Sequence, residues 1–104
     1  MAWVNVCALA DVTEDIPFAV ELNGKQLGIY KVGDEVFALE NVCPHAYALL
    51  TDGFVEDAVI ECPLHEAMFE IRTGKLLGGP GQRNLCTYPV KVEDDQVFVD
   101  DKEI

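Results

Sequence analysis

The sequence predicts a single all-β domain whose strands run mostly antiparallel. Its apolar residues occur in short runs that alternate with polar residues, and many of these residues are β-branched or aromatic. Turn residues such as Asn23-Gly24 separate the runs, and no long segment has the spacing of an amphipathic helix. A chain of 104 residues is long enough for one compact domain but not for two.

The first half of the chain is expected to contain four strands. Residues 3–7 form the first, and a polar loop over residues 8–16 has room for one helical turn. Residues 18–22 and 26–32 form a hairpin, because Asn23-Gly24 between them is the strongest short hairpin signal. A turn at residues 33–35 leads into a strand at residues 36–39.

The second half is expected to alternate strands with two segments that contain Cys, Pro and His. The chain leaves the first of these segments through Asp52-Gly53 and forms a strand at residues 59–61. After the second segment, residues 67–71 form a strand that ends in a turn at residues 72–74. Residues 87–92 and 96–100 close a final hairpin over the acidic residues 93–95.

Both histidines of the protein stand close after a cysteine. The chain reads Cys43-Pro44-His45, then sixteen residues, then Cys62-Pro63-Leu64-His65. Thiolate sulfur and neutral imidazole nitrogen are ligands for soft transition metals and metal clusters. These two Cys-His pairs therefore predict a metal centre with two ligands of each kind.

The order of the ligands favours two metal ions over one. A structural zinc site usually takes both Cys from one pair and both His from the other, whereas each pair here is mixed. In extended backbone, residues i and i+2 stand about 6.6 Å apart on one face, so Cys43 and His45 can reach different atoms. The pattern fits a [2Fe–2S] cluster with Cys43 and Cys62 on one iron and His45 and His65 on the other. A zinc-stabilised interaction module remains an alternative.

These motifs, followed by Met68-Phe69-Glu70-Ile71, Thr73-Gly74-Lys75 and Gly79-Pro80-Gly81, resemble those of Rieske proteins. More narrowly, the chain is similar over nearly its whole length to the small ferredoxins of bacterial ring-hydroxylating dioxygenases. The resemblance implies three stacked antiparallel sheets in one domain, residues 1–104. It also implies a small cluster-binding subdomain at about residues 42–82.

The resemblance further implies a one-electron carrier that accepts electrons from a flavin-dependent reductase and delivers them to a terminal oxygenase. Such a carrier is not itself an enzyme, and the sequence shows no Ser-His-acid set and no Gly-rich nucleotide loop. Partners would dock around His45 and His65, next to four further residues: Tyr47, Leu64, Glu66 and Pro80. A Rieske-like small subunit of a nitrite reductase, or of another multi-subunit oxidoreductase, is an alternative within the same fold.

The charge and the remaining cysteines narrow the partners and the location. The chain contains seven Lys and Arg and nineteen Asp and Glu, which give a formal charge of −12. This negative charge argues against nucleic acid and anionic membrane as partners. The acidic surface either keeps the protein in solution or steers it towards basic partners. With no secretory leader and no membrane span expected, the protein is expected to be cytoplasmic. A monomer is the expectation for a mobile carrier. Cys7 and Cys86 lie outside the motif and are expected only to pack.

Overall fold

The computed structural model describes residues 3–42, 48–63, 67–78 and 83–102, and these residues form strands and two short 3-10 helices. The strands are β1 Trp3–Ala8, β2 Phe18–Leu22, β3 Lys25–Val32, β4 Glu35–Glu40, β5 Phe54–Glu56, β6 Val59–Glu61, β7 Met68–Glu70, β8 Leu76–Gly78, β9 Thr87–Tyr88, β10 Val90–Glu93 and β11 Gln96–Asp100. The 3-10 helices are η1 Leu9–Asp11 and η2 Leu50–Asp52. Neither helix of the described residues has the length or the apolar character needed to cross a membrane. The all-β prediction is confirmed.

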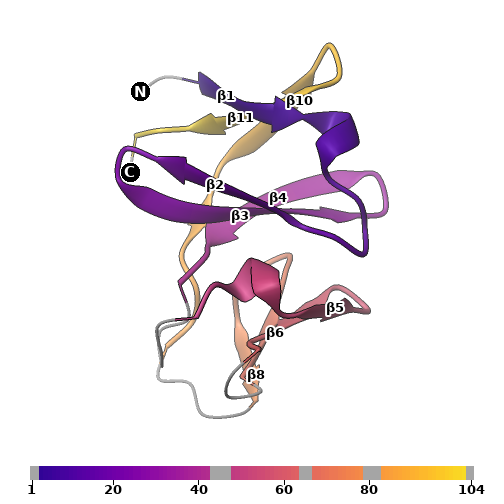
Figure 1. Cartoon of the computed structure of the whole chain (residues 1–104), viewed down its shortest axis with the longest axis vertical. Helices are drawn as coiled ribbons and strands as arrows, with labels where there is room; N and C mark the ends of the chain where they lie inside the picture. The colour runs from indigo at the N-terminus through magenta and orange to yellow at the C-terminus, as the bar shows by residue number, and fades with distance from the viewer. Residues whose placement is uncertain (1–2, 43–47, 64–66, 79–82, 103–104) are drawn as a thin grey trace.

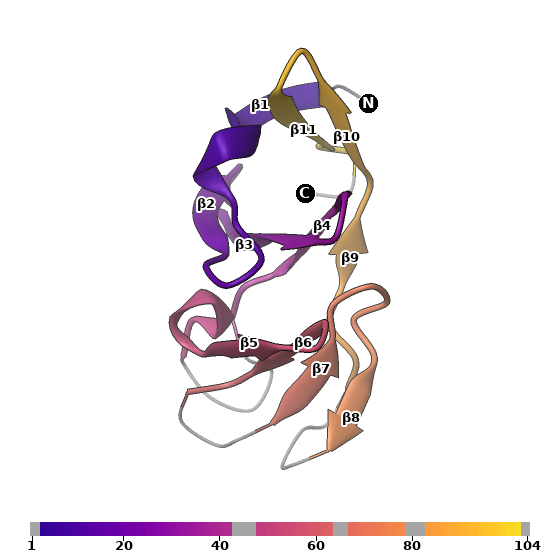
Figure 2. The same cartoon turned by 90° about the vertical axis from the view of Figure 1, so that its right-hand side faces the viewer.

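The strands form three antiparallel sheets that are stacked along the long axis of the molecule (Figures 1 and 2). The first sheet has the order β1-β11-β10, and so joins the two ends of the chain. The second has the order β2-β3-β4-β9, and the third has the order β5-β6-β7-β8. The three stacked sheets implied by the resemblance are therefore present.

The second sheet is the middle layer, and it is buried on both faces. Leu27 and Ile29 of β3 pack with Val97 and Val99 of the first sheet. Tyr30, the next residue of β3, packs on the opposite face in the core shared with the third sheet. Because successive side chains of a strand point to opposite faces, β3 serves both cores at once.

Two of the tight turns confirm the predicted hairpins. Asn23 and Gly24 have φ angles of 52° and 83°, the left-handed values that a two-residue type I′ hairpin turn requires. The turn between β10 and β11 is built in the same way, with φ angles of 53° and 61° at Asp94 and Asp95. These turns fix the register of the strands that they join.

The prediction of one strand over residues 87–92 is wrong, because Pro89 divides it. Proline has no N–H to donate to a ladder, so the pairing stops at this residue. Thr87–Tyr88 pairs with β4 in the second sheet, whereas Val90–Glu93 pairs with β11 in the first. The chain thus passes from one sheet to another at Pro89.

The third sheet contains two strands that the sequence pattern does not predict. Phe54–Glu56 pairs with β6, and Leu76–Gly78 pairs with β7. The strand expected at residues 67–71 is shorter, Met68–Glu70, because Ile71 already lies in the following turn. The predicted strand at residues 59–61 is confirmed as β6.

Candidate metal centre

The structure describes one of the four predicted metal ligands, Cys62. Three predicted ligands lie outside the described residues: Cys43, His45 and His65. Four predicted docking residues also lie outside them: Tyr47, Leu64, Glu66 and Pro80. The site is therefore described from Cys62 and from the residues that flank the other segments.

Cys62 directly follows β6 and is 1% exposed. Its backbone N–H donates to the carbonyl oxygen of Ala67 at 2.8 Å, which ties together the two ends of the turn from β6 to β7. Its side chain belongs to the apolar core that contains Ile60 and Phe69. A sulfur held in this way has few accessible positions, as a cluster ligand requires.

The residues that flank the first Cys-His pair are also held together. Val42 and Leu49 form an antiparallel bridge, and the N–H of Leu50 donates to the carbonyl of Asn41 at 2.7 Å. Leu50 is fully buried in the same core as Cys62. The structure thus brings the stems of both Cys-His pairs to one end of the third sheet, away from β1 and β11 (Figure 1).

A bidentate ion pair connects the end of β4, which leads into the first Cys-His pair, to the chain that follows residues 79–82. Arg83 donates two hydrogen bonds to the carboxylate of Glu40, the last residue of β4, and one of them measures 2.9 Å. The N–H of Cys86 donates to the same carboxylate at 2.7 Å. Burial raises the pKa of Glu40, but the hydrogen bonds from Arg83 and Cys86 outweigh burial and hold this pKa below its usual value.

The donor set and its surroundings fit an iron–sulfur cluster. The two predicted cysteines and two predicted histidines would supply the ligand types of the mixed Cys₂His₂ cluster, and Cys62 is a buried sulfur at a closed turn. Across residues 3–42, 48–63, 67–78 and 83–102, no group of three or more His, Cys, Asp or Glu side chains could hold a metal. The described part of the chain therefore offers no competing metal site.

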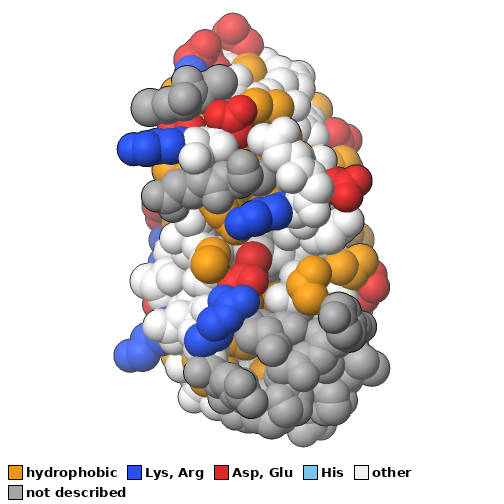
Figure 3. All heavy atoms as spheres, turned by 90° about the vertical axis from the view of Figure 1, so that its left-hand side faces the viewer, with side chains coloured by type: hydrophobic (Ala, Val, Ile, Leu, Met, Phe, Trp, Pro, Cys, Tyr) orange, Lys and Arg blue, Asp and Glu red, His pale blue; other side chains and the backbone are white. Residues whose placement is uncertain are grey.

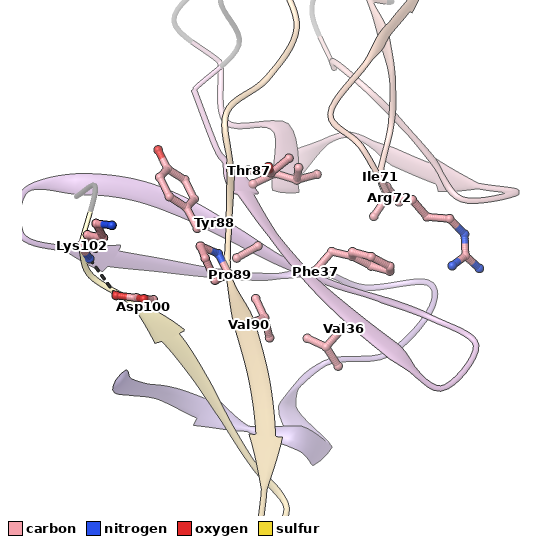
Figure 4. Close-up of a pocket in the computed structure, with 12 residues that line it drawn as sticks. Val36, Phe37, Ile71, Arg72, Thr87, Tyr88, Pro89, Val90, Asp100 and Lys102 are labelled. Carbon is pink, nitrogen blue, oxygen red and sulfur yellow. Dashed lines mark hydrogen bonds between the residues drawn. The ribbon is translucent and has the colours of Figure 1, made fainter. Parts of the chain in front are cut away.

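A cleft of about 630 Å³ lies between the second sheet and the chain that crosses to the first (Figure 4). Phe37, Pro89 and Val90 form part of its apolar wall. Arg72 lies over the Phe37 ring at 5.7 Å from its centroid and pairs with Glu35 outside the cleft. Among the residues that the structure describes, the lining includes neither His nor Cys, so this part of the wall has no imidazole base or thiol nucleophile.

The strongest local cluster of acidic residues lies far from the stems of the Cys-His pairs. Glu93, Asp94 and Asp95 are exposed at the turn between β10 and β11, which lies at the opposite end of the 38 Å long axis (Figure 1). Figure 3 shows acidic side chains gathered at this end of the molecule. The Debye length at physiological salt is about 8 Å. The acidic side chains at this turn therefore mainly improve the solvation of the protein. They contribute little to contacts at the end of the molecule where the stems of the Cys-His pairs lie (the metal end).

Three polar residues of the site have no counterpart in the sequence analysis: Glu40, Asn41 and Arg83. Glu40 and Arg83 stand 43 residues apart, so no local pattern indicates their pairing. Asn41 follows an apolar strand, where asparagine usually signals a turn. Its position two residues before Cys43 is the one available signal of another role.

Comparison with known proteins gives concordant results. A sequence model described as the Rieske [2Fe-2S] domain matches residues 2–89. The ferredoxin component of the naphthalene 1,2-dioxygenase system of Pseudomonas putida is 42% identical over 98 residues, which cover 94% of either chain. The solved structure of Sphingomonas yanoikuyae B1 ferredoxin has a TM-score of 0.90 at 39% identity, over 95% of this chain and 98% of that one.

A further solved structure is similar and contains two kinds of protein. It is described as a complex of reduced oxygenase and oxidized ferredoxin in carbazole 1,9a-dioxygenase. One of its chains matches with a TM-score of 0.87 at 35% identity, over 93% of this chain and 91% of that one. The similarity thus extends over nearly the whole chain in both sequence and fold.

Proposed function

The chain belongs to the Rieske [2Fe–2S] domain family, and we propose that it carries single electrons from a flavin-dependent reductase to the terminal oxygenase of an aromatic-ring-hydroxylating dioxygenase system. The observation that carries this proposal is the 42% identity with a dioxygenase ferredoxin component over 94% of both chains. The protein is an electron-transfer component and not the enzyme that acts on the aromatic substrate. Its cofactor is one Rieske-type [2Fe–2S] cluster.

We further propose which residues hold the cluster. Cys43 and Cys62 would bind one iron, and His45 and His65 would bind the other. When bound, the cluster takes up and releases one electron at a time. Support comes from the burial of Cys62, from its closed turn, and from the paired stems of the segment that contains Cys43 and His45.

In this proposal, different parts of one domain bind the cluster and support the cluster-binding part. Residues of about 42–82 hold the cluster, and the first two sheets support them as a base. The common core of Tyr30 and Leu39 with Leu50, Phe69 and Ile71 makes the third sheet rigid relative to the second. A rigid support keeps the ligand geometry similar in both redox states, which favours rapid electron exchange.

The partners would dock at the metal end, where imidazole ligands offer the shortest route for an electron. Tyr47, Leu64, Glu66 and Pro80 are the proposed docking residues beside His45 and His65. The formal charge of −12 would steer the whole protein towards basic partner surfaces in a salt-dependent manner.

The same proposal places the protein in the cytoplasm as a monomer. The thiols of Cys7 and Cys86 are free, as expected in a reducing compartment. A monomer suits a carrier that must leave one partner before it reaches the other. A small subunit of a nitrite reductase is less well supported, because the relatives described above are ferredoxins.

A reconstituted electron-transfer assay tests the function. The chemically reduced protein is mixed with the oxygenase component of a naphthalene 1,2-dioxygenase system, and the reoxidation of its visible absorption is followed by stopped flow. The proposal expects saturable reoxidation that slows as salt is raised. Failure to reoxidise with any dioxygenase component, together with co-purification with a large reductase subunit, would favour the nitrite reductase alternative.

Ligand variants test the site separately from the function. Cys62→Ala and His65→Ala are expected to abolish the visible spectrum of the cluster. Cys86→Ala is the matched control, because Cys86 is an exposed thiol outside the two pairs. A normal cluster spectrum in Cys62→Ala or His65→Ala would contradict the ligand set.

A further inference from the structure

Asn41 is a fully buried polar residue at the start of the first Cys-His segment. It follows the last residue of β4, stands two residues before Cys43 and is 0% exposed. Buried polar side chains are costly unless hydrogen bonds satisfy them, and a satisfied one defines a precise local geometry. The hydrogen bonds of Asn41 therefore show which parts of the chain it holds together.

Four hydrogen bonds connect Asn41 to three places in the fold. Its N–H donates to the carbonyl of Gln26 at 2.9 Å, which continues the middle sheet beyond β4. Its carbonyl accepts from the N–H of Leu50 at 2.7 Å. Its side-chain Oδ1 accepts from the N–H of Thr51 at 2.8 Å, and its Nδ2 donates to Thr51 Oγ1 at 2.9 Å.

These bonds span the segment that carries Cys43 and His45. Asn41 lies on the chain that enters the segment, whereas Leu50 and Thr51 lie on the chain that leaves it. The bridge between Val42 and Leu49 lies between Asn41 and the segment on the same pair of stems. The amide side chain of Asn41 thus joins the two stems, in addition to the backbone bond from Leu50 and the Val42–Leu49 bridge.

The orientation of Thr51 is itself fixed by the middle sheet. Its Cγ2 methyl lies 3.0 Å from the position that a Cβ atom would take on Gly28. The absence of a side chain at Gly28 leaves room for both this methyl and the ring of Tyr30. Packing on one branch of Thr51 therefore directs the other branch, Oγ1, towards Asn41.

We propose that Asn41 and Thr51 form a positioning pair that holds the first ligand segment and thereby controls how tightly the protein retains its cluster. The inference rests on the proposed ligand set. The pair does not bind the cluster itself; it acts through the stems on Cys43 and His45. Its effect should therefore appear in cluster retention beyond any effect on the stability of the fold.

Two substitutions at Thr51 separate these effects. Thr51→Val keeps the shape of the side chain but leaves Asn41 Nδ2 without its acceptor. Thr51→Ser keeps the hydroxyl but removes the methyl that packs over Gly28. Asn41→Ala is a stronger perturbation, because it also leaves the N–H of Thr51 without an acceptor, and this loss can prevent folding. Thr51→Val is therefore the primary variant.

The experiment measures cluster loss from the purified holoprotein in the presence of an iron chelator, followed by visible circular dichroism. Global stability is measured in parallel by urea unfolding. Val97→Ala serves as the control, because Val97 is fully buried in the other core, away from Cys62. EPR line widths of the reduced cluster report disorder in the ligand geometry without depending on activity.

Thr51→Val is expected to lose its cluster about tenfold faster than the wild type and to broaden the EPR lines. Thr51→Ser keeps the hydroxyl but loses the packing that orients it, so its rate of cluster loss is expected to lie between those of the wild type and Thr51→Val. Val97→Ala is expected to lower stability without accelerating cluster loss to the same degree. If Thr51→Val loses its cluster no faster than Val97→Ala at equal stability, the pair is merely structural and the inference is overturned. A wild-type protein that binds no [2Fe–2S] cluster would instead overturn the ligand set, and this inference with it.

Discussion

Substituting alanine for Gly53 should displace the backbone that leads into Cys62. Gly53 lies between η2 and β5, and a Cβ atom there would lie 1.9 Å from the carbonyl oxygen of Glu61 and 3.1 Å from that of Leu50. Carbon and oxygen normally approach to about 3.3 Å or more. The φ angle of −88° is open to any residue, so the cost is steric.

The expected cost is at the upper end of the range for overpacking. The missing separation exceeds about 1 Å and falls on backbone, which cannot rotate away as a flexible side chain can. We therefore expect Gly53→Ala to lower the free energy of unfolding by about 3 kcal/mol, a large share of the usual 5–15 kcal/mol. Because Glu61 directly precedes Cys62, the cluster content should fall as well.

Urea unfolding and iron analysis of two glycine variants test this expectation. Gly78→Ala is the matched control, since the one atom of the described residues that a Cβ atom there would meet is Met68 Cε, at 3.8 Å. We expect the control to change the free energy of unfolding by less than about 1 kcal/mol. If Gly53→Ala is no less stable than Gly78→Ala, the packing described between η2 and the end of β6 is refuted.

Three further predictions follow from single residues. Ala58 has a φ of 62°, which is unfavourable for an L-residue, so Ala58→Gly should raise the free energy of unfolding in urea by about 0.5–1 kcal/mol; a loss would contradict the turn geometry. Burial raises the pKa of Cys7 to about 11, so a thiol reagent at pH 8 should modify the exposed Cys86 before Cys7. Cys86→Ser should abolish the fast phase of this modification, whereas Cys7→Ser should leave it in place. The lowered pKa of Glu40 contributes stability that is present above its unfolded pKa of about 4.3 and is lost as the pH falls through its folded value. Glu40→Gln should therefore show less acid destabilisation than the wild type, and an unchanged pH dependence would count against the pairing with Arg83.

Local chemistry explains which parts of the fold could be predicted from the sequence. The Asn23-Gly24 hairpin follows from two residues that readily adopt positive φ, and its strand Phe18–Leu22 has the predicted bounds. The strands β5 and β8 could not be predicted, because each has three residues, too few for an alternating pattern to be recognised, although each pairs with its neighbour in the sequence. The break at Pro89 was predictable in principle, since a proline inside a strand argues against continuous pairing.

At the site, too, local sequence patterns could be predicted and contacts between distant parts of the chain could not. Cysteine and histidine spacing is a local pattern, so it indicates the ligand set, which stays a prediction for the three ligands outside the described residues. The pairing of Glu40 with Arg83 is not local, and neither is the contact of Asn41 with Thr51 across the ligand segment. Such supporting contacts depend on how the sheets stack, and only the three-dimensional structure reveals them.

The central claim is that this chain holds a Rieske cluster through two cysteines and two histidines. The most direct test is the low-temperature EPR spectrum of the dithionite-reduced protein, with iron, sulfide and zinc counted on the same sample. We expect two irons and two sulfides per chain, an anisotropic spin-half signal with a low average g value, and coupling to histidine nitrogen. A reduced sample without this signal that contains stoichiometric zinc would contradict the claim and would favour a zinc-stabilised interaction module.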